Sequence, residues 1–239
     1  MAENEALSYK VVQSKIRLTG ILSVVLWEDV WQARKEIVKS RLEALLGISQ
    51  RIPGRLTVVR RIDKQTASGF LNKNHLQGSV SSKTQYGLYL PKKYYRVLNQ
   101  EVFKSLPVEE LLVAVATFSH PRIFRRDEES YRSYEMIRFA NLVCSTVVGG
   151  VNKLISAFVS DFHPGDLMTY ADLEWSEGTS YARLGFESIS DTGPIGFWLD
   201  PVSLNRVSKK TSGSTVGNQV SVFNLGSRKF VRAFNKPLS

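Results

Sequence analysis

A glycine pair between a strand pattern and an amphipathic helix pattern restricts the folds open to this chain. Ser133–Asn141 reads SYEMIRFAN, which favours a strand, and CSTVVGG follows it as a turn. The next segment, VNKLISAFVSDF, places apolar side chains three and four residues apart, as in a helix with one buried face. DLMTYAD then favours another buried strand. Strand, tight turn, helix and strand in succession predict an α/β or mixed α+β fold around one largely central sheet.

Other segments extend this pattern in both directions. Further helices are predicted at Leu26–Gly47, Lys64–Gly78 and Thr179–Phe186, and further strands at Arg55–Ile62, Tyr86–Leu90, Glu110–Ser119, 187–190 and 196–200. The charged stretch RRDEESYR is expected to be a loop. The IPG turn at Ile52–Gly54 separates an N-terminal extension with an amphipathic helix, residues 1–52, from a main domain, residues 53–239.

Composition excludes several classes of protein. The 239 residues are 43% hydrophobic and 23% charged, as in ordinary globular proteins. No run approaches the roughly 18 apolar residues of a membrane span, and MAENEALSYK lacks the order of a signal peptide, so we expect a cytoplasmic protein without membrane contact. The single cysteine, Cys144, excludes an intrachain disulfide framework. No HxH or HExxH spacing occurs, and no metal site is predicted.

The net charge of +10 and the pI near 9.7 favour a polyanionic partner, and DNA is the partner that we expect. The C-terminal segment 201–239 holds seven Lys or Arg and no carboxylate. PKKYYR interleaves cations with rings that can stack on bases, and two other basic stretches add charge. Exposed basic loops also occur on many proteins that bind no nucleic acid. The predicted nucleic-acid contacts are Lys92, Lys93, Tyr94, Arg96, Arg125, Arg126, Lys209 and Lys210.

The glycine turn itself is a candidate anion site. A glycine turn that feeds a helix N-terminus presents unpaired backbone N–H groups, and the helix dipole favours a phosphate there. The alternative is a tight turn that requires glycine for backbone reasons alone. The predicted cofactor-binding residues are Val148, Gly149, Gly150, Asn152 and Lys153, together with Arg138 on the preceding strand.

Two further side chains are candidates for proton transfer. Asp172 ends a buried strand, where α/β folds place ligands, and a partly buried carboxylate there can accept a proton from an amine. Its alternative role is to cap the following turn. His75 lies in the polar segment NKNHLQG and can act as a base near neutral pH.

Glu135 and Arg138, three residues apart on one strand, are expected on opposite faces.

The segments WEDVWQARKEIVKSRLEALLG, FLNKNHLQG, YEMIRFANLVCSTVVGGVNKL, TYADLEWSEGTSYARLGF and SVFNLGSRKFV span residues 26–233. The predicted order of three strands, glycine turn, helix, strand, short helix ending in Tyr-x-x-Leu-Gly-Phe and strand resembles the GNAT fold of acyltransferases. The five segments themselves resemble more closely still proteins of phages and mobile elements in which such a domain follows a very-short-patch-repair-like nuclease domain. Residues 1–52 would then contain the remnant of the segment that links the two domains. A more distant likeness, through His75 and through Tyr170-Ala171-Asp172 followed by Gly178 and Tyr181, is to the Mom family, which modifies DNA adenine.

The resemblance implies a central mixed sheet that splays where the strands on either side of the helix part, with acetyl-CoA or another acyl-CoA in the gap. It implies that Tyr181 protonates the departing thiolate, although Tyr181 could equally pack the short helix on the sheet. The usual signature, Arg/Gln-x-x-Gly-x-Gly/Ala, begins with Arg or Gln and ends with Gly or Ala. This chain differs from it at both ends, with Thr146 at the first position and Val151 at the last.

These observations favour a GNAT-fold transferase that modifies DNA or a modified nucleobase, with His75 and Asp172 handling protons and Tyr181 the leaving group. Two alternatives stay open. One is a DNA-binding accessory module without catalytic activity, and the other is a conventional acetyl-CoA-dependent N-acetyltransferase.

Overall fold

The computed structural model describes residues 3–99, 103, 105–126, 129–209 and 219–234. The chain forms two compact units. We call Glu36–Met168 with Ala233–Ser239 the core unit, and Met1–Lys35 with Thr169–Arg232 the terminal unit. Each unit is described by itself.

The core unit is built on a mixed sheet. Strands β2 (Val58–Arg61), β3 (Thr84–Pro91), β4 (Glu110–Phe118) and β6 (Glu129–Asn141) are antiparallel neighbours in that order. The first three residues of β8 (Asp166–Asp172) pair with β6 in parallel, from Ser133↔Asp166 to Glu135↔Met168. The parallel pairing between β6 and β8 is therefore short.

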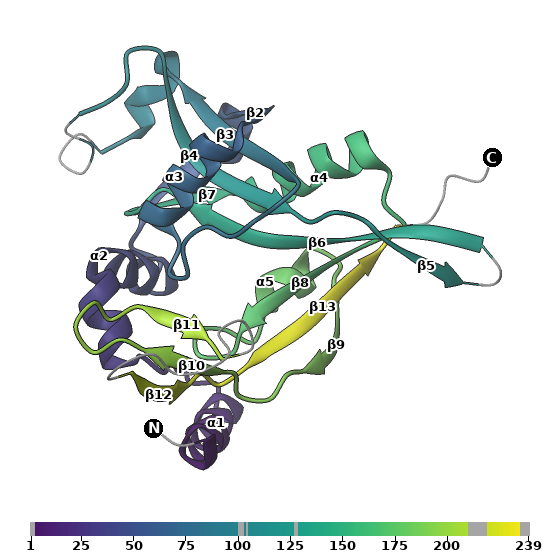
Figure 1. Ribbon diagram of the computed structural model, residues 1–239. Coiled ribbons are helices and arrows are strands. Elements are labelled where there is room, and N and C mark those ends of the chain that lie inside the picture. The colour runs from purple at the N-terminus through teal and green to yellow at the C-terminus, as the bar shows by residue number, and fades with distance from the viewer. Residues whose placement is uncertain (1–2, 100–102, 104, 127–128, 210–218, 235–239) are drawn as a thin grey trace. The chain divides into compact units, whose positions relative to one another are not determined.

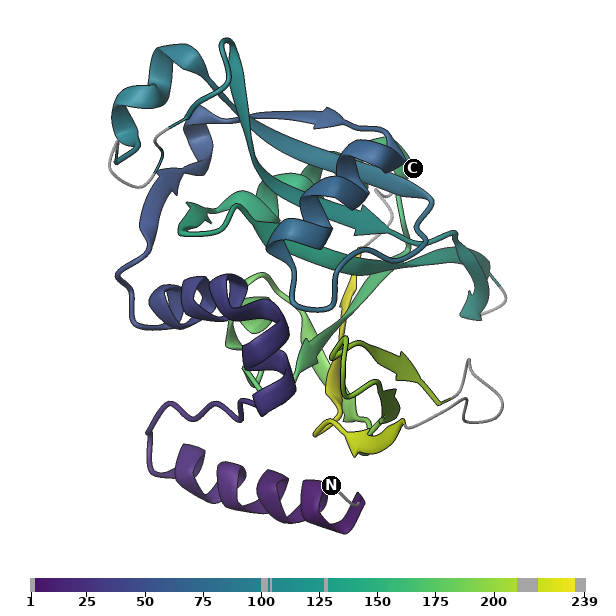
Figure 2. The same ribbon diagram turned by 60° about the vertical axis from the view of Figure 1, so that its left-hand side comes forward.

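Helices cover both faces of this sheet (Figure 1). Helix α3 (Lys64–Asn74) begins at Asp63, whose side chain caps the Thr66 N–H, and its apolar side chains pack against β4 and β6. Helix α4 (Gly150–Phe162) covers the other face, where the ring of Phe158 stacks on that of Phe118 with centroids 4.0 Å apart. After α3 the chain folds back beside the helix before it enters β3 (Figure 2).

The turn that the sequence predicts at CSTVVGG contains a strand. Residues Ser145–Val148 form β7, which pairs in parallel with β1 (Gln50–Pro53), from Gln50↔Ser145 to Pro53↔Val148. Two short 3-10 helices, η1 (Gly54–Leu56) and η2 (Lys92–Val97), follow β1 and β3. The expectation of a simple turn was wrong because β7 is only four residues long, too short for its alternating pattern to be distinctive.

The expectation of a loop at RRDEESYR was also wrong. Strand β5 (Arg122–Arg126) and the beginning of β6 form an antiparallel hairpin, paired from Arg122↔Ser133 to Arg126↔Glu129. Exposed strands tolerate charged side chains, since both faces need not be buried, and so charge alone did not indicate a loop here.

The terminal unit contains α1 (Glu3–Leu18), the first part of α2 (Glu28–Leu45), the end of β8, and α5 (Thr179–Arg183). Its strand β13 (Ser227–Ala233) lies between β8 and β9 (Glu187–Asp191). A second, three-stranded sheet has β10 (Gly196–Leu199) between β11 (Arg206–Ser208) and β12 (Val220–Phe223). The basic C-terminal segment is thus strand-forming over much of its described length.

Helix α2 is broken at Arg34, whose φ of −135° and ψ of 33° are not helical. The single helix predicted over Leu26–Gly47 is therefore two helical segments. The predicted α/β fold class is confirmed. Apart from the additional strands β5 and β7, the order β3, β4, β6, glycine turn, α4, β8, α5, β9 is the order that the GNAT resemblance implies.

Candidate functional site

The glycine turn of the core unit is open at the N-terminus of α4. Gly149 adopts the left-handed conformation with φ of 75°, and α4 begins at Gly150. A Cβ atom at Gly149 would meet nothing within 4 Å, and Val148 is exposed. The N–H groups of the first turn of α4 have no acceptor inside the helix, and they carry the positive end of its dipole. The turn can therefore receive an anion.

One side of this turn is closed by the 3-10 helix η1. A Cβ atom at Gly54 would lie 2.5 Å from the Val148 carbonyl oxygen, so only glycine permits this approach. The Lys153 ammonium donates to the carbonyl oxygens of Gly54, at 3.1 Å, and Thr57, at 2.5 Å. Lys153 thus holds η1 beside the turn, a role that needs no phosphate.

The predicted cofactor residues are brought together in part. Val148, Gly149, Gly150 and the exposed Asn152 lie at the turn and the first turn of α4. Arg55 directly follows Gly54 and is exposed, which makes it a cation beside the turn that sequence reasoning missed. The sequence signal was Gly54 in the IPG turn, which was interpreted only as a boundary.

Arg138 lies on the α3 face of the sheet. It pairs with Thr117 of β4, whereas the next pair in β4 is Phe118↔Met136, so Ile137 is an extra residue in β6. This β-bulge reverses the alternation of side chains, and Glu135 and Arg138 consequently lie on one face. The expectation of opposite faces was wrong for this reason. Burial lowers the pKa of Arg138, and the charge of Glu135 opposes that effect.

His75 is the C-cap of α3, and its surroundings keep the imidazole neutral. Burial, followed by the charges of Arg138 and Arg41, lowers the pKa of His75 to about 3. The Gln77 N–H donates to Nδ1 at 3.1 Å, which places the ring proton on Nε2. A base of such low pKa accepts protons poorly at pH 7.

Asp172 closes the turn after β8 in the terminal unit. Its Oδ1 accepts the Glu174 N–H at 3.0 Å, and its carbonyl oxygen accepts the N–H groups of Trp175 and Ser176 at 3.1 and 2.9 Å. The capping role considered from sequence is therefore present, and the carboxylate is half-buried.

The carboxyl with the most altered acidity is Glu174, which sequence reasoning did not select. Its side chain is 6% exposed, and its Oε1 accepts the Trp27 indole N–H at 2.5 Å and the Leu225 N–H at 3.3 Å. Burial and the charge of Asp172 raise its pKa to about 8. The only sequence signal was an acidic residue between two buried apolar ones in LEW.

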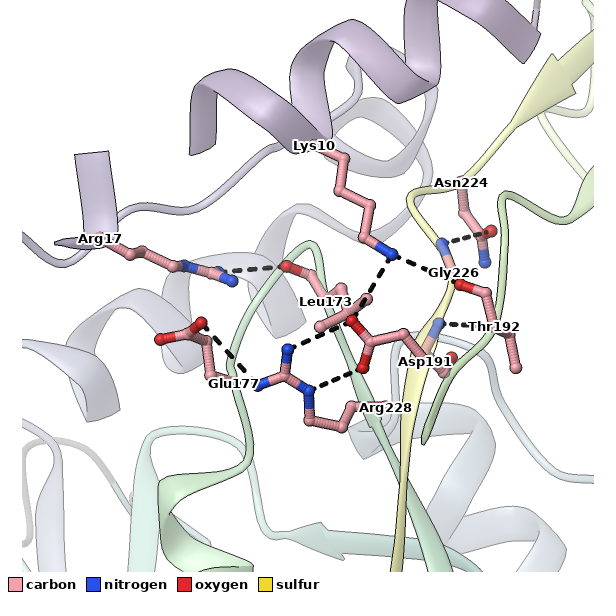
Figure 3. Close-up of polar contacts among 10 residues, drawn as sticks. Lys10, Arg17, Leu173, Glu177, Asp191, Thr192, Asn224, Gly226 and Arg228 are labelled. Carbon is pink, nitrogen blue, oxygen red and sulfur yellow. Dashed lines mark hydrogen bonds and ion pairs between the residues drawn. The ribbon is translucent and has the colours of Figure 1, made fainter. Parts of the chain in front are cut away.

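A polar network surrounds the end of β8 (Figure 3). Arg228 forms a two-point contact with Asp191, at 2.7 and 3.2 Å, and lies 3.9 Å from Glu177. Lys10 of α1 is 3.7 Å from Asp191, and Arg17 donates to the Leu173 carbonyl oxygen at 3.1 Å. Helix α1 is thereby attached by charged side chains to the turn after β8 and to β9.

Tyr181 lies at α5 among aromatic side chains of the terminal unit. Its ring centroid is 5.9 Å from that of Phe186 and 5.6 Å from that of Phe230. The packing role considered from sequence is therefore present. A role as a proton donor stays a prediction.

The predicted nucleic-acid residues are scattered over several elements. In the core unit Lys92, Lys93 and Arg96 are exposed on η2, and Lys93 lies over the Tyr94 ring at 5.1 Å. Arg125 is exposed on β5, where Arg126 follows it. In the terminal unit Lys209 lies over Trp198 at 4.3 Å and donates to the Ser221 hydroxyl. Lys210 lies outside the described residues.

Across the part of the chain that the structure describes, no three His, Cys, Asp or Glu side chains group as a metal site would require. Over the same residues, no helix is both long and apolar enough to cross a membrane.

Fold and turn together define an α/β protein with the element order of a GNAT acyltransferase. No protein-family model matches the chain, and no curated protein matches it. Among solved structures, the chain is similar to the NatC complex bound to Gag peptide and CoA, at 10% identity and a TM-score of 0.40, over 75% of this chain and 99% of that one.

Two other solved structures show a comparable likeness. The KacTA–DNA complex is 17% identical with a TM-score of 0.37, over 56% of this chain and 87% of that one. The histone acetyltransferase HPA2 and related acetyltransferase from Corynebacterium glutamicum ATCC 13032 is 9% identical with a TM-score of 0.36, over 91% and 98%. Scores this low show a loose likeness, and we base no functional argument on them.

Proposed function

We propose that this protein is an acyl-CoA-dependent acyltransferase. The observation that carries the proposal is the open Gly149–Gly150 turn. It follows strand β7 and begins α4, in the element order of a GNAT domain. The free N–H groups of α4 suit the pyrophosphate of an acyl-CoA, with Asn152 and Arg55 as further donors.

The transfer itself is simple in its atom balance. The acceptor amine nitrogen attacks the thioester carbonyl carbon, the carbon–sulfur bond breaks, the amine loses one proton, and the thiolate gains one to leave as coenzyme A. The amine proton is proposed to pass to Asp172 on the sequence prediction alone, and the thiolate proton to come from the Tyr181 phenol, as the GNAT resemblance implies; both residues belong to the terminal unit. His75 is assigned no proton transfer, since its low pKa makes it a weak base.

For the acceptor we propose an amine of a DNA base. Support comes from the net charge of +10 and from the exposed cations of η2 beside an aromatic ring. The sequence likeness to phage and mobile-element proteins, to nuclease-linked domains and to the Mom family points to the same acceptor.

Donor binding is tested at Gly149, where Asp and Asn differ by charge alone and both tolerate a positive φ. We expect Gly149→Asp to weaken coenzyme A binding at least tenfold in calorimetry and Gly149→Asn to weaken it much less. Gly47→Asp is the matched control, because Gly47 has φ of 76° and equally open surroundings. Absence of binding by the unmodified protein would refute the donor, and equal binding by the Asp and Asn variants would refute the turn as its site.

The acceptor is tested by mass spectrometry of nucleosides from cells that express the protein or its Asp172→Ala variant. An acylated nucleoside that depends on Asp172 supports DNA modification. If DNA is unchanged and acetylated proteins or metabolites appear instead, the protein is a conventional N-acetyltransferase. If DNA binds and coenzyme A does not, it is an accessory DNA-binding module.

A further inference from the structure

The core unit contains a small pocket on the α3 side of the sheet. It has a volume of about 290 Å³ and lies between α3 and the segment that folds back from α3 into β3. The lining side chains come from one side of α3, from this segment and from the ends of β3 and β4. They are Lys64, Ala67, Ser68, Leu71, Ser79, Val80, Ser81, Ser82, Gln85 and Thr117.

The pocket is rich in hydrogen-bond donors. Half of its lining residues carry a hydroxyl group, one is an amide and one is a cation, while none is a carboxylate. A ligand that complements this lining is rich in acceptors and bears negative charge.

Thr117 provides independent evidence for a ligand. Its side chain is 1% exposed, and among the residues that the structure describes its hydroxyl has no hydrogen-bond partner. Such a group is costly when it is left unsatisfied, and native structures contain few of them. Thr117 lines the pocket, and less than 1 Å² of its hydroxyl oxygen is accessible, so a ligand supplies the missing partner once the pocket wall at Thr117 opens slightly.

The walls of the pocket are held in place by contacts within the core unit. The Ser79 N–H donates to the Asn72 Oδ1 of α3 at 2.9 Å, which fixes the returning segment to the helix. The Gln85 amide donates to the carbonyl and hydroxyl oxygens of Ser82 at 3.1 and 2.9 Å. These contacts hold the returning segment to α3 and to the start of β3.

The charge around the pocket is positive. Arg138 is the cross-strand partner of Thr117, and its Nε donates to the carbonyl oxygen of Gly78, one residue before Ser79, at 3.4 Å. Lys64 adds a second cation at the exposed end of α3. The same arginine contributes to keeping His75 uncharged.

We propose that this pocket binds a small phosphorylated ligand, with the Thr117 hydroxyl and neighbouring serines donating to phosphate oxygens and Lys64 matching the charge. A phosphate group offers at least three oxygens around one centre and can use several hydroxyl donors, whereas a carboxylate offers two. At about 30 Å³ per water, the volume equals roughly ten waters, enough for a phosphate with a short polar substituent. This inference concerns a site separate from the Gly149 turn and does not depend on the proposed function.

The test uses calorimetry on the full chain with ribose 5-phosphate, inorganic phosphate, ribose and acetate as probes. We expect ribose 5-phosphate to bind, and Thr117→Val to weaken it about tenfold, as for one hydrogen bond to a charged group. Thr84→Val is the matched control, since Thr84 is buried in β3 of the same sheet and does not line the pocket. Lys64→Gln should weaken both phosphate probes and leave ribose unchanged.

Three results would overturn the proposal. They are no binding of any phosphorylated probe, equal affinity in Thr117→Val, or tighter binding of ribose or acetate than of ribose 5-phosphate. Circular dichroism shows whether each variant is folded, and the more conservative Thr117→Ser, which keeps the hydroxyl, should restore affinity. Coenzyme A binding that is retained in Thr117→Val separates this pocket from the turn.

Discussion

The Glu174 carboxyl makes the stability of the terminal unit fall as the pH rises. Its pKa is about 8 in the folded chain, against an ordinary value of 4.5. The folded state therefore binds more protons than the unfolded state between these two values, and the free energy of unfolding decreases with pH across that interval. We expect Glu174→Gln to remove most of this decrease, because the amide stays neutral and can still accept the Trp27 N–H.

The magnitude follows from the separation of the two pKa values. At about 1.4 kcal/mol per pKa unit the full separation corresponds to roughly 5 kcal/mol, which is an upper bound because a charged carboxylate can draw in water or shift its neighbours. We expect the unmodified protein to lose about 2 to 5 kcal/mol between pH 5 and pH 8.5, and the Gln variant less than about 1 kcal/mol.

The assay is urea unfolding followed by tryptophan fluorescence at several pH values. All four tryptophans, Trp27, Trp31, Trp175 and Trp198, belong to the terminal unit, so their emission reports on this unit. Glu177→Gln is the matched control, since Glu177 is an exposed carboxylate of the same turn and should keep the pH dependence. Parallel stability profiles for the unmodified protein and Glu174→Gln would refute the reasoning.

Three further predictions concern single side chains. Gly54→Ala should destabilise the core unit by about 1 to 3 kcal/mol by overpacking. Gly69→Ala in α3, whose added Cβ atom meets nothing within 4 Å, should stabilise the same unit by about 1 kcal/mol. Equal thermal shifts of the two variants would contradict this prediction. Thr117→Val should leave the ligand-free protein unchanged or stabilise it by about 1 kcal/mol, measured by urea unfolding, and a clear loss of stability would show that its hydroxyl is satisfied. Arg228→Gln should cost at most about 1 kcal/mol at pH 7, because the pair with Asp191 is partly exposed. The lowered pKa of Asp191 means that this difference is present above the ordinary carboxyl pKa and disappears as the pH falls, so stabilities that still differ at pH 2 would count against it.

Long segments with one clear periodicity could be predicted from sequence. The i, i+3, i+4 pattern of α4 predicts a helix with one buried face, and the apolar runs of β3 and β4 predict buried strands. All three elements lie close to where they were expected. The strand β7 and the hairpin of β5 with β6 could not be predicted in the same way. The pairing of β7 depends on β1, which is distant in the chain, whereas the β5–β6 hairpin is local but carries many charged, exposed side chains.

The candidate site was less predictable than the fold. Glycines that need a special backbone conformation, such as Gly149, leave a sequence signal, and the turn was found from it. The pKa values of Glu174 and His75 depend on burial and on charges that folding brings close. Neither burial nor these charges can be predicted from the spacing of residues in the sequence. The bulge at Ile137 likewise moved Arg138 to the face of Glu135 without any local signal.

The positions at which the chain passes between its two compact units also determine how the gene can be divided. Two of the three lie inside strands, in β8 after Met168 and in β13 after Arg232, and the third lies in α2 after Lys35, next to the break at Arg34. A gene fragment that encodes either unit alone would begin or end within β8 or β13 and leave backbone hydrogen-bonding groups without partners. We therefore expect the two units to be inherited, expressed and lost together, as one hereditary piece rather than as two exchangeable modules.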